Sequence, residues 1–318
     1  MTSINIKNLS KSYGDTRAVQ NLSLEVKKGE LFGLIGPDGA GKTTTFRMLT
    51  TLILPDEGSA TVEGSDIVRD YKQIRNCVGY MPGRFSLYQD LTVQENLEFF
   101  ATVFGTTIEQ NYSLIKDIYE QIKPFSNRRA GKLSGGMKQK LALCCALIHK
   151  PEVLFLDEPT TGVDAVSRKE FWKMLAKLKA QGITILVSTP YMDEASLCDR
   201  IALMQAGKIL STSTPEQIIA DYPTTLYAVK APDLYALLQH LRQKPEIDSC
   251  YPFGEYLHLT LKEATDPYQF EQQLTQTFSE VEWKPITPTI EDSFIRLMET
   301  TNWQIGKSTN HPINKWMQ

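Results

Sequence analysis

The sequence lacks any long hydrophobic run. Apolar runs such as Val153–Leu156 and the nearly apolar Ile183–Val187 hold only four or five of the 318 residues, whereas a membrane-spanning helix needs about 20. The opening residues, Met-Thr-Ser-Ile-Asn-Ile-Lys, also lack the apolar stretch of a secretory signal peptide. We therefore expect a protein that is made in the cytosol, stays there and does not itself cross a membrane.

Excess positive charge and cysteine are scarce as well. Lys and Arg total 34 against 37 Asp and Glu, for a net charge of −3, so no overall basic field favours nucleic acid as a partner. The cysteines are odd in number and show no metal-type spacing, which favours reduced, mostly buried thiols over disulfides or a metal site. They are Cys77, Cys144, Cys145, Cys198 and Cys250.

What is present is an ordinary globular composition, with 42% apolar and 22% charged residues, which excludes a disordered or low-complexity chain. Up to about Ser211, short β-type runs alternate with helical segments, and this predicts a mostly parallel sheet with crossover helices. The runs Leu31–Ile35, Val153–Leu156 and Ile183–Val187 are nearly all apolar, as is typical of strands buried on both faces. A further helix is expected to start at Thr214-Pro215-Glu216-Gln217.

The remainder predicts a smaller α+β domain. Its pattern is strand, helix, two strands, helix, strand and a last helix, the split-βαβ order of ferredoxin-like domains. We therefore divide the chain into a first domain over 1–215, a small α+β domain over 222–300 and an unassigned polar tail over 301–318. The expected elements include Thr225–Lys230, Asp233–Arg242, Glu255–Leu261, Pro267–Phe278, Val281–Lys284 and Thr289–Thr300.

The clearest motif is Gly36-Pro37-Asp38-Gly39-Ala40-Gly41-Lys42-Thr43, which fits the phosphate-loop pattern. It follows an apolar strand and precedes the helical stretch Thr44–Leu52. Glycines let the backbone N–H groups curl inward around an anion; Lys42 is expected to reach the β- and γ-phosphates, and the Thr43 hydroxyl to ligate Mg²⁺. The four fixed positions arise by chance in roughly one such chain in a hundred, so we predict a nucleotide-binding site.

Two acidic residues, Asp157 and Glu158, directly follow the apolar run Val153–Leu156, which is expected to be a buried strand. Asp157 is expected to hold Mg²⁺ through water, and Glu158 is placed to polarise an attacking water. The alternative, two solvated carboxylates at a strand end, is less favoured beside a phosphate loop.

Between these motifs lies Leu133-Ser134-Gly135-Gly136-Met137, at the start of a helical stretch that runs through His149. Residues 2–215 resemble the nucleotide-binding domain of ABC transporters, in which this motif is the signature. The resemblance implies a P-loop NTPase fold of ABC type, α/β with a mostly parallel core sheet, a β subdomain and a helical signature subdomain. It also implies adenine stacking by Tyr13, and a D-loop at Thr161-Gly162-Val163-Asp164, where Val163 replaces the usual Leu.

In the family, two such domains face each other head to tail with two ATP molecules between them. The resemblance therefore implies that Ser134, Gly135, Gly136 and Asp164 contact ATP held by a second ABC ATPase subunit, whereas residues 36–44, from Gly36 to Thr44, hold the chain's own ATP with Mg²⁺. The signature glycines again leave N–H groups free at a positive helix end.

A narrower resemblance is to the drug-efflux branch typified by daunorubicin-resistance exporters. It is carried by the phosphate loop, Gly79-Tyr80-Met81-Pro82, Tyr191-Met192-Asp193-Glu194-Ala195 and Thr289–Ile295. This implies an ATPase subunit on the inner face of the cell membrane that energises a separately encoded integral membrane permease for efflux of small amphipathic molecules, drugs or lipids. In the family the region Phe85–Glu95 receives the permease's coupling helix, although Phe85, Leu87 and Tyr88 could equally belong to the core.

Two positions depart from the family pattern. Gly83 stands where the family has a Gln that contacts Mg²⁺ and the attacking water, and Pro190 stands where a switch His contacts the γ-phosphate. Both losses fall on the chain's own half-site, whereas the residues it contributes to its partner are intact. Two hypotheses remain open: a weakly hydrolytic site that completes an active site on a different subunit, or a homodimer with slow turnover.

A second function class is a soluble ABC ATPase acting on the ribosome or on DNA. Such proteins usually carry two nucleotide domains or a long coiled coil, and tend to show basic patches; the sequence has none of these features. The small domain is expected to serve structural packing, with a regulatory, ligand-sensing or dimer-stabilising role as the alternative. His240 and His258 lie singly in it and are interpreted as ordinary surface or packing residues.

Overall fold

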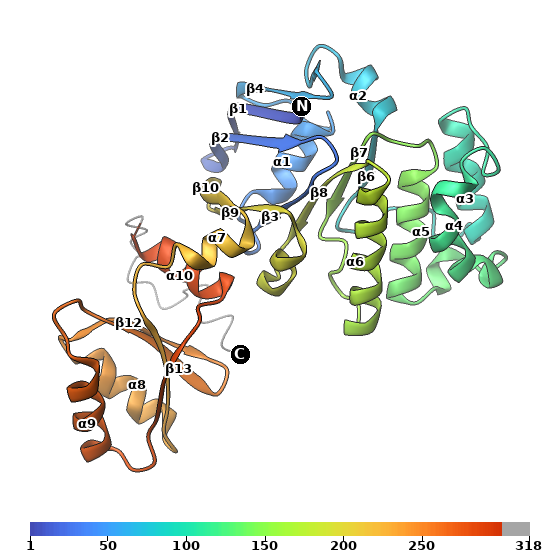
Figure 1. Ribbon diagram of the computed structural model, residues 1–318. Helices are drawn as coiled ribbons and strands as arrows, with labels where there is room; N and C mark the ends of the chain where they lie inside the picture. The colour runs from blue at the N-terminus through green and yellow to red at the C-terminus, as the bar shows by residue number, and fades with distance from the viewer. Residues whose placement is uncertain (301–318) are drawn as a thin grey trace. The chain divides into compact units, whose positions relative to one another are not determined.

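The computed structural model describes residues 1–300 and divides into two compact units (Figure 1). The first unit is Met1–Glu216 and the second begins at Gln217. The short helix α7 (Pro215–Ala220) starts at the predicted proline. The polar tail 301–318 lies outside the described residues.

A six-stranded sheet forms the centre of the first unit, in the order β10-β9-β3-β8-β7-β6. Every pairing in it is parallel except that of β9 with β10. Three of its strands are buried along their whole length and confirm the apolar runs, with β8 shifted slightly toward the carboxyl end. The bounds are β3 (Leu31–Ile35), β6 (Val78–Met81), β7 (Val153–Asp157), β8 (Thr184–Thr189), β9 (Arg200–Gln205) and β10 (Lys208–Ser213).

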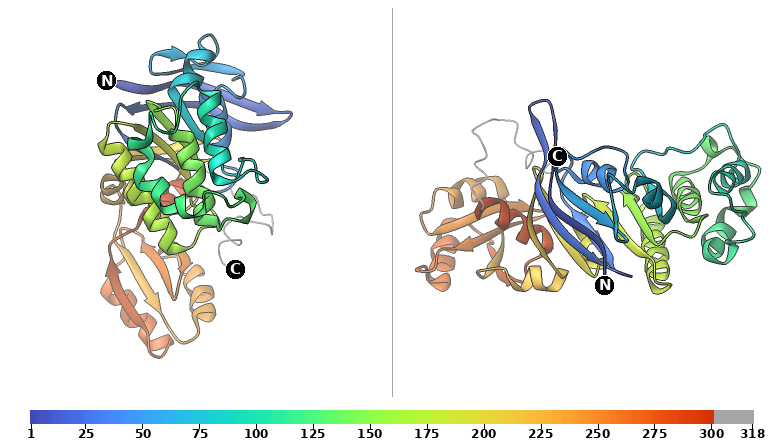
Figure 2. Two further views of the ribbon diagram at one scale, coloured as in Figure 1. Left: turned by 90° about the vertical axis from the view of Figure 1, so that its right-hand side faces the viewer. Right: turned by 90° about the horizontal axis from the view of Figure 1, so that it is seen from above.

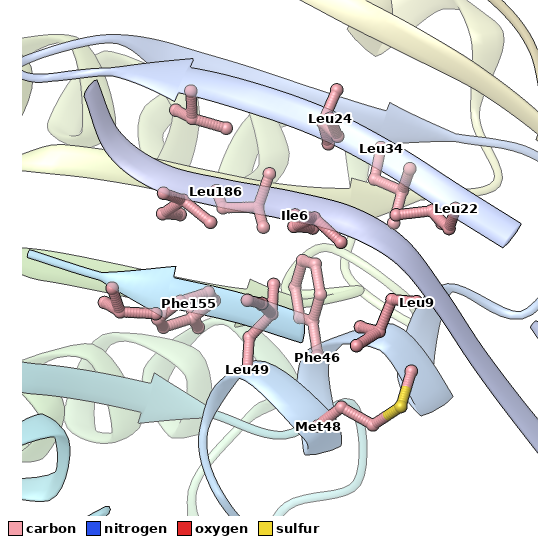
Figure 3. Close-up of a cluster of buried hydrophobic side chains, with 14 of the residues drawn as sticks. Ile6, Leu9, Leu22, Leu24, Leu34, Phe46, Met48, Leu49, Phe155 and Leu186 are labelled. Atoms are coloured by element: carbon pink, nitrogen blue, oxygen red, sulfur yellow. The ribbon is translucent and has the colours of Figure 1, made fainter. Parts of the chain in front are cut away.

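A second sheet of the first unit is antiparallel and has the order β2-β1-β4-β5. Helix α1 (Lys42–Leu49) packs between the two sheets (Figure 3). Its Phe46 is fully buried and meets Phe155 of β7 edge to face, with ring centroids 5.9 Å apart. This packing fixes the helix that follows the phosphate loop. The strands are β1 (Thr2–Tyr13), β2 (Thr16–Lys27), β4 (Glu57–Val62) and β5 (Ser65–Asp66).

Three helices, α3, α4 and α5, pack side by side at one end of the first unit, seen as the teal and green ribbons of Figures 1 and 2. Helix α5 ends before His149, whose ring stacks on Phe104 with centroids 3.8 Å apart. Within residues 1–300, no helix has both the length and the apolar character that crossing a bilayer requires. The helices are α2 (Tyr71–Cys77), α3 (Val93–Val103), α4 (Tyr112–Ile122), α5 (Gly135–Leu147) and α6 (Ala165–Ala180), with 3₁₀ turns at Lys123–Phe125, Ala130–Lys132 and Met192–Leu197.

The cysteines are all free thiols, as expected. Cys144, Cys145 and Cys198 are buried, and Cys77 and Cys250 are half-buried. Burial raises the pKa of the Cys250 thiol to about 12, so this group stays protonated and unreactive near neutral pH.

The second unit has the element order that the sequence predicts. Its antiparallel sheet has the order β12-β13-β11-β14, and Leu257, Leu259 and Leu261 of β13 pack with residues of α8 and α9 in one apolar cluster. The bounds are β11 (Leu226–Lys230), α8 (Leu234–Arg242), β12 (Ile247–Phe253), β13 (Tyr256–Leu261), α9 (Pro267–Thr277), β14 (Glu282–Ile286) and α10 (Ile290–Thr300).

The other face of β13 is buried too, because His258 meets a carboxylate from α10. His258 Nδ1 lies 2.7 Å from Asp292 Oδ1, and the same oxygen accepts a hydrogen bond of 2.8 Å from the Tyr251 hydroxyl. The second oxygen accepts from the backbone N–H and the hydroxyl of Thr289, both at 2.7 Å. His258 is thus a packing residue with a defined partner rather than a surface residue.

This buried carboxylate makes the second unit sensitive to acid. Burial alone would raise the pKa of Asp292, but the hydrogen bonds from His258, Thr289 and Tyr251 outweigh it and hold the pKa below its ordinary value of 3.8. A lower pKa in the folded state means that ionised Asp292 stabilises the fold above the unfolded-state pKa. That contribution is lost as the pH falls through the folded-state pKa.

We expect Asp292→Asn to lower the melting temperature of the second unit at pH 7, and the difference in melting temperature from the wild type to narrow as the pH falls below about 4. Thermal unfolding followed by circular dichroism across this range measures both effects. Asp266→Asn, at the N-cap of α9, is the control and is expected to change little, because Asn caps a helix about as well as Asp. A gap for Asp292→Asn that stays constant with pH would contradict the assignment.

Candidate functional site

The phosphate-loop sequence lies between β3 and α1, pressed against two neighbouring strands. A Cβ atom on Gly36 would lie 2.1 Å from the Met204 carbonyl oxygen, and one on Gly41, whose φ is +108°, would lie 2.3 Å from the Ala18 carbonyl oxygen. Gly39, with φ +80°, has open space around it. Two glycines are therefore required by close backbone approach, whereas the third is required only by its dihedral angle.

Lys42 opens α1, and its side chain is 3% exposed. Its ammonium donates hydrogen bonds to the carbonyl oxygens of Gly36 at 2.8 Å and Pro37 at 3.0 Å, and it lies 3.2 Å from Glu158 Oε1. The first N–H groups of a helix lack intrahelical partners. Because α1 begins at Lys42, these N–H groups and the Lys42 ammonium lie beside the same loop. The arrangement is suited to binding an anion.

Three oxygen-bearing side chains meet at the carboxyl ends of β7 and β8: Asp157 of β7, Ser188 of β8 and Thr43 of α1. Asp157, 2% exposed, accepts hydrogen bonds at Oδ1 from the Thr43 hydroxyl at 3.1 Å and from the Ser188 hydroxyl at 2.7 Å. Thr43 and Asp157 are thus adjacent, as the sequence predicts. Sequence reasoning missed Ser188, because a serine inside an apolar strand gave no sign of its partner on β7.

Glu158 has an unusual backbone. Its φ of +51° lies in the left-handed region, where a non-glycine residue is uncommon and costs about 1–3 kcal/mol when the surroundings impose it. Its N–H lies 3.1 Å from both the carbonyl and the hydroxyl oxygen of Ser188. The strand end therefore fixes Glu158 in a strained turn beside Lys42.

Both departures from the family pattern lie against this site. A Cβ atom on Gly83 would lie 3.0 Å from the Asp157 carbonyl oxygen and 3.7 Å from Glu158 Cβ. Pro190 directly follows Thr189, whose carbonyl accepts a hydrogen bond of 3.3 Å from the Gly36 N–H. Neither position supplies a polar side chain.

The signature residues and Asp164 form a second, exposed cluster. Ser134 caps α5 and accepts from the Met137 N–H at 3.4 Å, so one N–H of this helix end is already used. Asp164 caps α6 and accepts from the N–H groups of Val166 and Ser167.

Hydrogen bonds from Ser167 and Val166 to its carboxylate lower the pKa of Asp164.

The two helix starts of this cluster touch. Cβ atoms on Gly135 and Gly136 would lie 3.2 Å from the Gly162 carbonyl oxygen and 2.8 Å from Ser167 Oγ. In the part of the chain that the structure describes, no hydrogen bond or ion pair joins Ser134 or Asp164 to the phosphate loop. Within the described residues, this cluster and the phosphate loop are therefore separate in their hydrogen bonding.

The remaining predicted residues differ in exposure. Tyr13, at the end of β1, is 48% exposed, with the Lys11 ammonium 6.0 Å from its ring centroid. In the region 85–95, Leu87 is buried and Tyr88 is 51% exposed against Phe99. This region therefore contributes both to the core and to the surface.

Comparison with known proteins decides the family. The family model for ABC transporters matches residues 19–161. The chain is 35% identical over 301 residues to the Nod factor export ATP-binding protein I of Rhizobium sp. (strain N33), covering 92% of this chain and 96% of that protein. This chain belongs to the ABC transporter ATP-binding proteins. It is also 39% identical over 289 residues to the probable multidrug ABC transporter ATP-binding protein YbhF of Escherichia coli (strain K12), covering 89% of this chain but only 50% of that protein.

Solved structures agree on the fold. An ATP-binding subunit of an ABC transporter superposes with a TM-score of 0.63 at 26% identity, over 69% of this chain and 92% of the other. A dimeric ATP-binding cassette bound to ADP and Pi, in a post-hydrolysis state, gives 0.60 at 25% identity, over 66% and 98%. The expected P-loop NTPase fold of ABC type is confirmed. The roles of individual residues stay predictions.

The backbone contacts of the loop lead to a test. We expect Gly41→Ala to abolish nucleotide binding, because its Cβ atom would collide with the Ala18 carbonyl and distort the loop. Gly39→Ala is the matched control: it bears only the cost of a left-handed alanine, about 1–2 kcal/mol, and is expected to keep binding within about tenfold. Titration with a fluorescent ATP analogue measures both; equal losses would contradict the steric account.

Proposed function

We propose that this chain is the ATP-binding and ATP-hydrolysing subunit of an ABC exporter. The proposal is carried by one observation: a buried lysine and a threonine of the phosphate loop contact two carboxylates at the end of β7. Lys42 Nζ lies 3.2 Å from Glu158 Oε1, and the Thr43 hydroxyl donates a hydrogen bond to Asp157. The relatives named for multidrug and Nod factor export support the transport assignment.

ATP binding rests on residues 36–44 and Tyr13. The backbone N–H groups of the loop and the first turn of α1 hold the phosphates, Lys42 pairs with the β- and γ-phosphates, and Tyr13 stacks on adenine. The exposed ring of Tyr13 offers a face for stacking. A phosphate oxygen would replace the carbonyl and carboxylate oxygens that now surround the Lys42 ammonium.

The donor set fits Mg²⁺. A hydroxyl from Thr43 and a carboxylate from Asp157 are hard oxygen ligands, and Mg²⁺ is commonly bound by few protein oxygens together with phosphates and water. Among residues 1–300 no group of three or more His, Cys, Asp or Glu could form an all-protein cage, in keeping with such a shared site. When bound, the ion neutralises charge on the transferred phosphoryl group.

Glu158 is the catalytic residue of the proposal. Its strained turn keeps the carboxylate beside the loop, where it can orient a water molecule and accept its proton. Ser188 holds both Asp157 and the Glu158 backbone and so sets their spacing. We assign Ser188 a positioning role.

The exposed half-site calls for a second ATPase subunit. Ser134, Gly135, Gly136 and Asp164 are proposed to contact ATP on that subunit, head to tail. Their exposure and their separation from this chain's loop support the arrangement, as does the dimer formed by a similar cassette. The second subunit is either a copy of this chain or a different ATPase.

We propose that ATP hydrolysis is slow at the site that this chain's own phosphate loop builds. Gly83 and Pro190 supply neither of the polar contacts that the family places there, and losing one oriented contact costs about 10²–10³ in rate by analogy with an oxyanion-hole donor. A site of this kind holds ATP and closes the dimer more than it turns ATP over.

A separately encoded integral membrane permease completes the assembly, with this chain peripheral on the inner face of the cell membrane. The exposed ring of Tyr88, on the region proposed to receive the permease, supports this docking, and it contacts the exposed ring of Phe99 on α3. The proposed cargo is a small amphipathic molecule or drug. A soluble ABC ATPase acting on the ribosome or DNA has no supporting observation, and we propose no nucleic-acid partner.

We expect the purified chain to bind ATP tightly but to hydrolyse it slowly, because its own site lacks both polar contacts. Turnover per chain across a protein-concentration series, with ATP binding measured in parallel, tests this. Turnover that rises with concentration and vanishes in Glu158→Gln would show instead a competent homodimer. In a mixed assembly with a second ATPase, Ser134→Arg is expected to reduce turnover more than Lys42→Ala does, since Ser134 serves the active partner site.

The contribution of position 190 can be tested separately. We expect Pro190→His to raise turnover at least about tenfold, because it restores a donor beside the γ-phosphate position. Pro190→Ala is the control: it removes the ring without supplying a donor and is expected to leave the rate near that of the wild type. Equal rates for the two variants, each with intact ATP binding, would show that the missing histidine does not limit the site.

A further inference from the structure

The first unit contains a buried carboxylate that the proposed chemistry does not use. Glu194, in the 3₁₀ turn Met192–Leu197, is 2% exposed. A buried carboxylate is costly unless it is paired and hydrogen-bonded. The partners of Glu194 come from three different segments of the chain, and each of those segments leads directly to a residue of one of the two half-sites.

One oxygen of Glu194 joins the ends of β7 and β8. Its Oε2 accepts hydrogen bonds from the Thr160 hydroxyl at 3.1 Å and the Thr189 hydroxyl at 2.5 Å. Thr160 belongs to the turn that follows Glu158. The Thr189 hydroxyl donates its hydrogen bond to Glu194 and accepts one from the Tyr191 N–H at 3.1 Å. The Thr189 carbonyl accepts a hydrogen bond from the Gly36 N–H of the phosphate loop.

The other oxygen faces helix α6. Arg168 Nε lies 3.7 Å from Glu194 Oε1, and the guanidinium stacks 4.4 Å from the Tyr191 ring centroid. Among residues 1–300, neither Arg168 Nε nor Glu194 Oε1 finds a hydrogen-bond partner. The Arg168 N–H bonds to the Asp164 carbonyl at 2.9 Å, so this ion pair lies one helical turn from the residue that faces the partner subunit.

We infer that Glu194 is a positioning residue that couples the two half-sites. It holds the turn after Glu158, the end of β8 and the start of α6 in one arrangement, so that nucleotide bound at the chain's own loop is sensed at Asp164, and docking of a partner at Asp164 is sensed at Glu158. Such coupling is reciprocal by thermodynamic linkage. The open Arg168–Glu194 pair is the contact that closes or widens as α6 shifts. The inference rests on the proposed function and deepens it.

The test compares Glu194→Gln with a matched buried carboxylate elsewhere. Glu30 is 7% exposed, and one carboxylate oxygen lies 3.3 Å from Arg200 Nη1. The other carboxylate oxygen accepts a hydrogen bond from the Lys27 N–H. Neither Arg200 nor Lys27 belongs to a proposed half-site. Glu30→Gln therefore controls for the loss of a buried ion pair as such. Hydrogen–deuterium exchange of the full chain, with and without ATP and Mg²⁺, is followed at residues 36–43 and 160–168.

In the wild type we expect ATP to slow exchange at both segments. Glu194→Gln is expected to keep the protection at 36–43 and to lose more than half of it at 160–168, with kcat reduced at least about tenfold and KM within about twofold. Glu30→Gln is expected to behave as the wild type. Should Glu194→Gln fail to fold, Arg168→Gln, at a side chain that is 26% exposed, is expected to give the same selective loss.

The possible failures are distinct. Retained protection at 160–168 in both Glu194→Gln and Arg168→Gln overturns the inference, as does protection in the wild type that is confined to 36–43. Absence of any ATP-dependent protection at 36–43 in the wild type overturns the proposed function as well.

Discussion

The pairing of a buried lysine with a strand-end carboxylate organises the first unit. Lys42 is 3% exposed, and removing such a charge from water is tolerable only because two loop carbonyls and Glu158 surround it. That arrangement requires β3, β8 and β7 to end at the same edge of one parallel sheet. The strand order delivers this edge, and the packing of Phe46 against Phe155 holds α1 and β7 together beneath it.

Features carried by consecutive residues could be predicted from the sequence. The apolar strands and the strand–loop–helix order of the phosphate-loop segment follow from local patterns, and the structure shows them. Thr43 and Asp157, 114 positions apart, are singled out because each lies in its own local motif. What could not be predicted are contacts of polar residues that lie outside any such motif. Ser188 reaches Asp157 across 31 positions, and Thr160 reaches Glu194 across 34. Hydrophobic periodicity does not indicate such partners, because a single polar residue in an apolar run has no assignable partner until the neighbouring strand is known.

The second unit shows the same limit in another form. The alternation of leucines in β13 indicates one apolar face, but it leaves open what covers the opposite face. The structure places α10 over that face, with Asp292 accepting hydrogen bonds from Tyr251, His258 and Thr289. A buried polar network costs free energy unless every member is satisfied, and it therefore specifies a single docking position for the helix. The role of this unit in transport stays a prediction.

The space around Gly83 has a consequence for how the two departures could be reversed. A Cβ atom there would lie 3.0 Å from the carbonyl oxygen of Asp157, closer than an ordinary contact, so a side chain at 83 requires this carbonyl to give way by a few tenths of an ångström. Position 190 carries no comparable obstruction among the contacts described. The two reversals therefore differ in kind: a glutamine at 83 must displace the carbonyl of the residue that would hold Mg²⁺, whereas a histidine at 190 meets no such contact among those described.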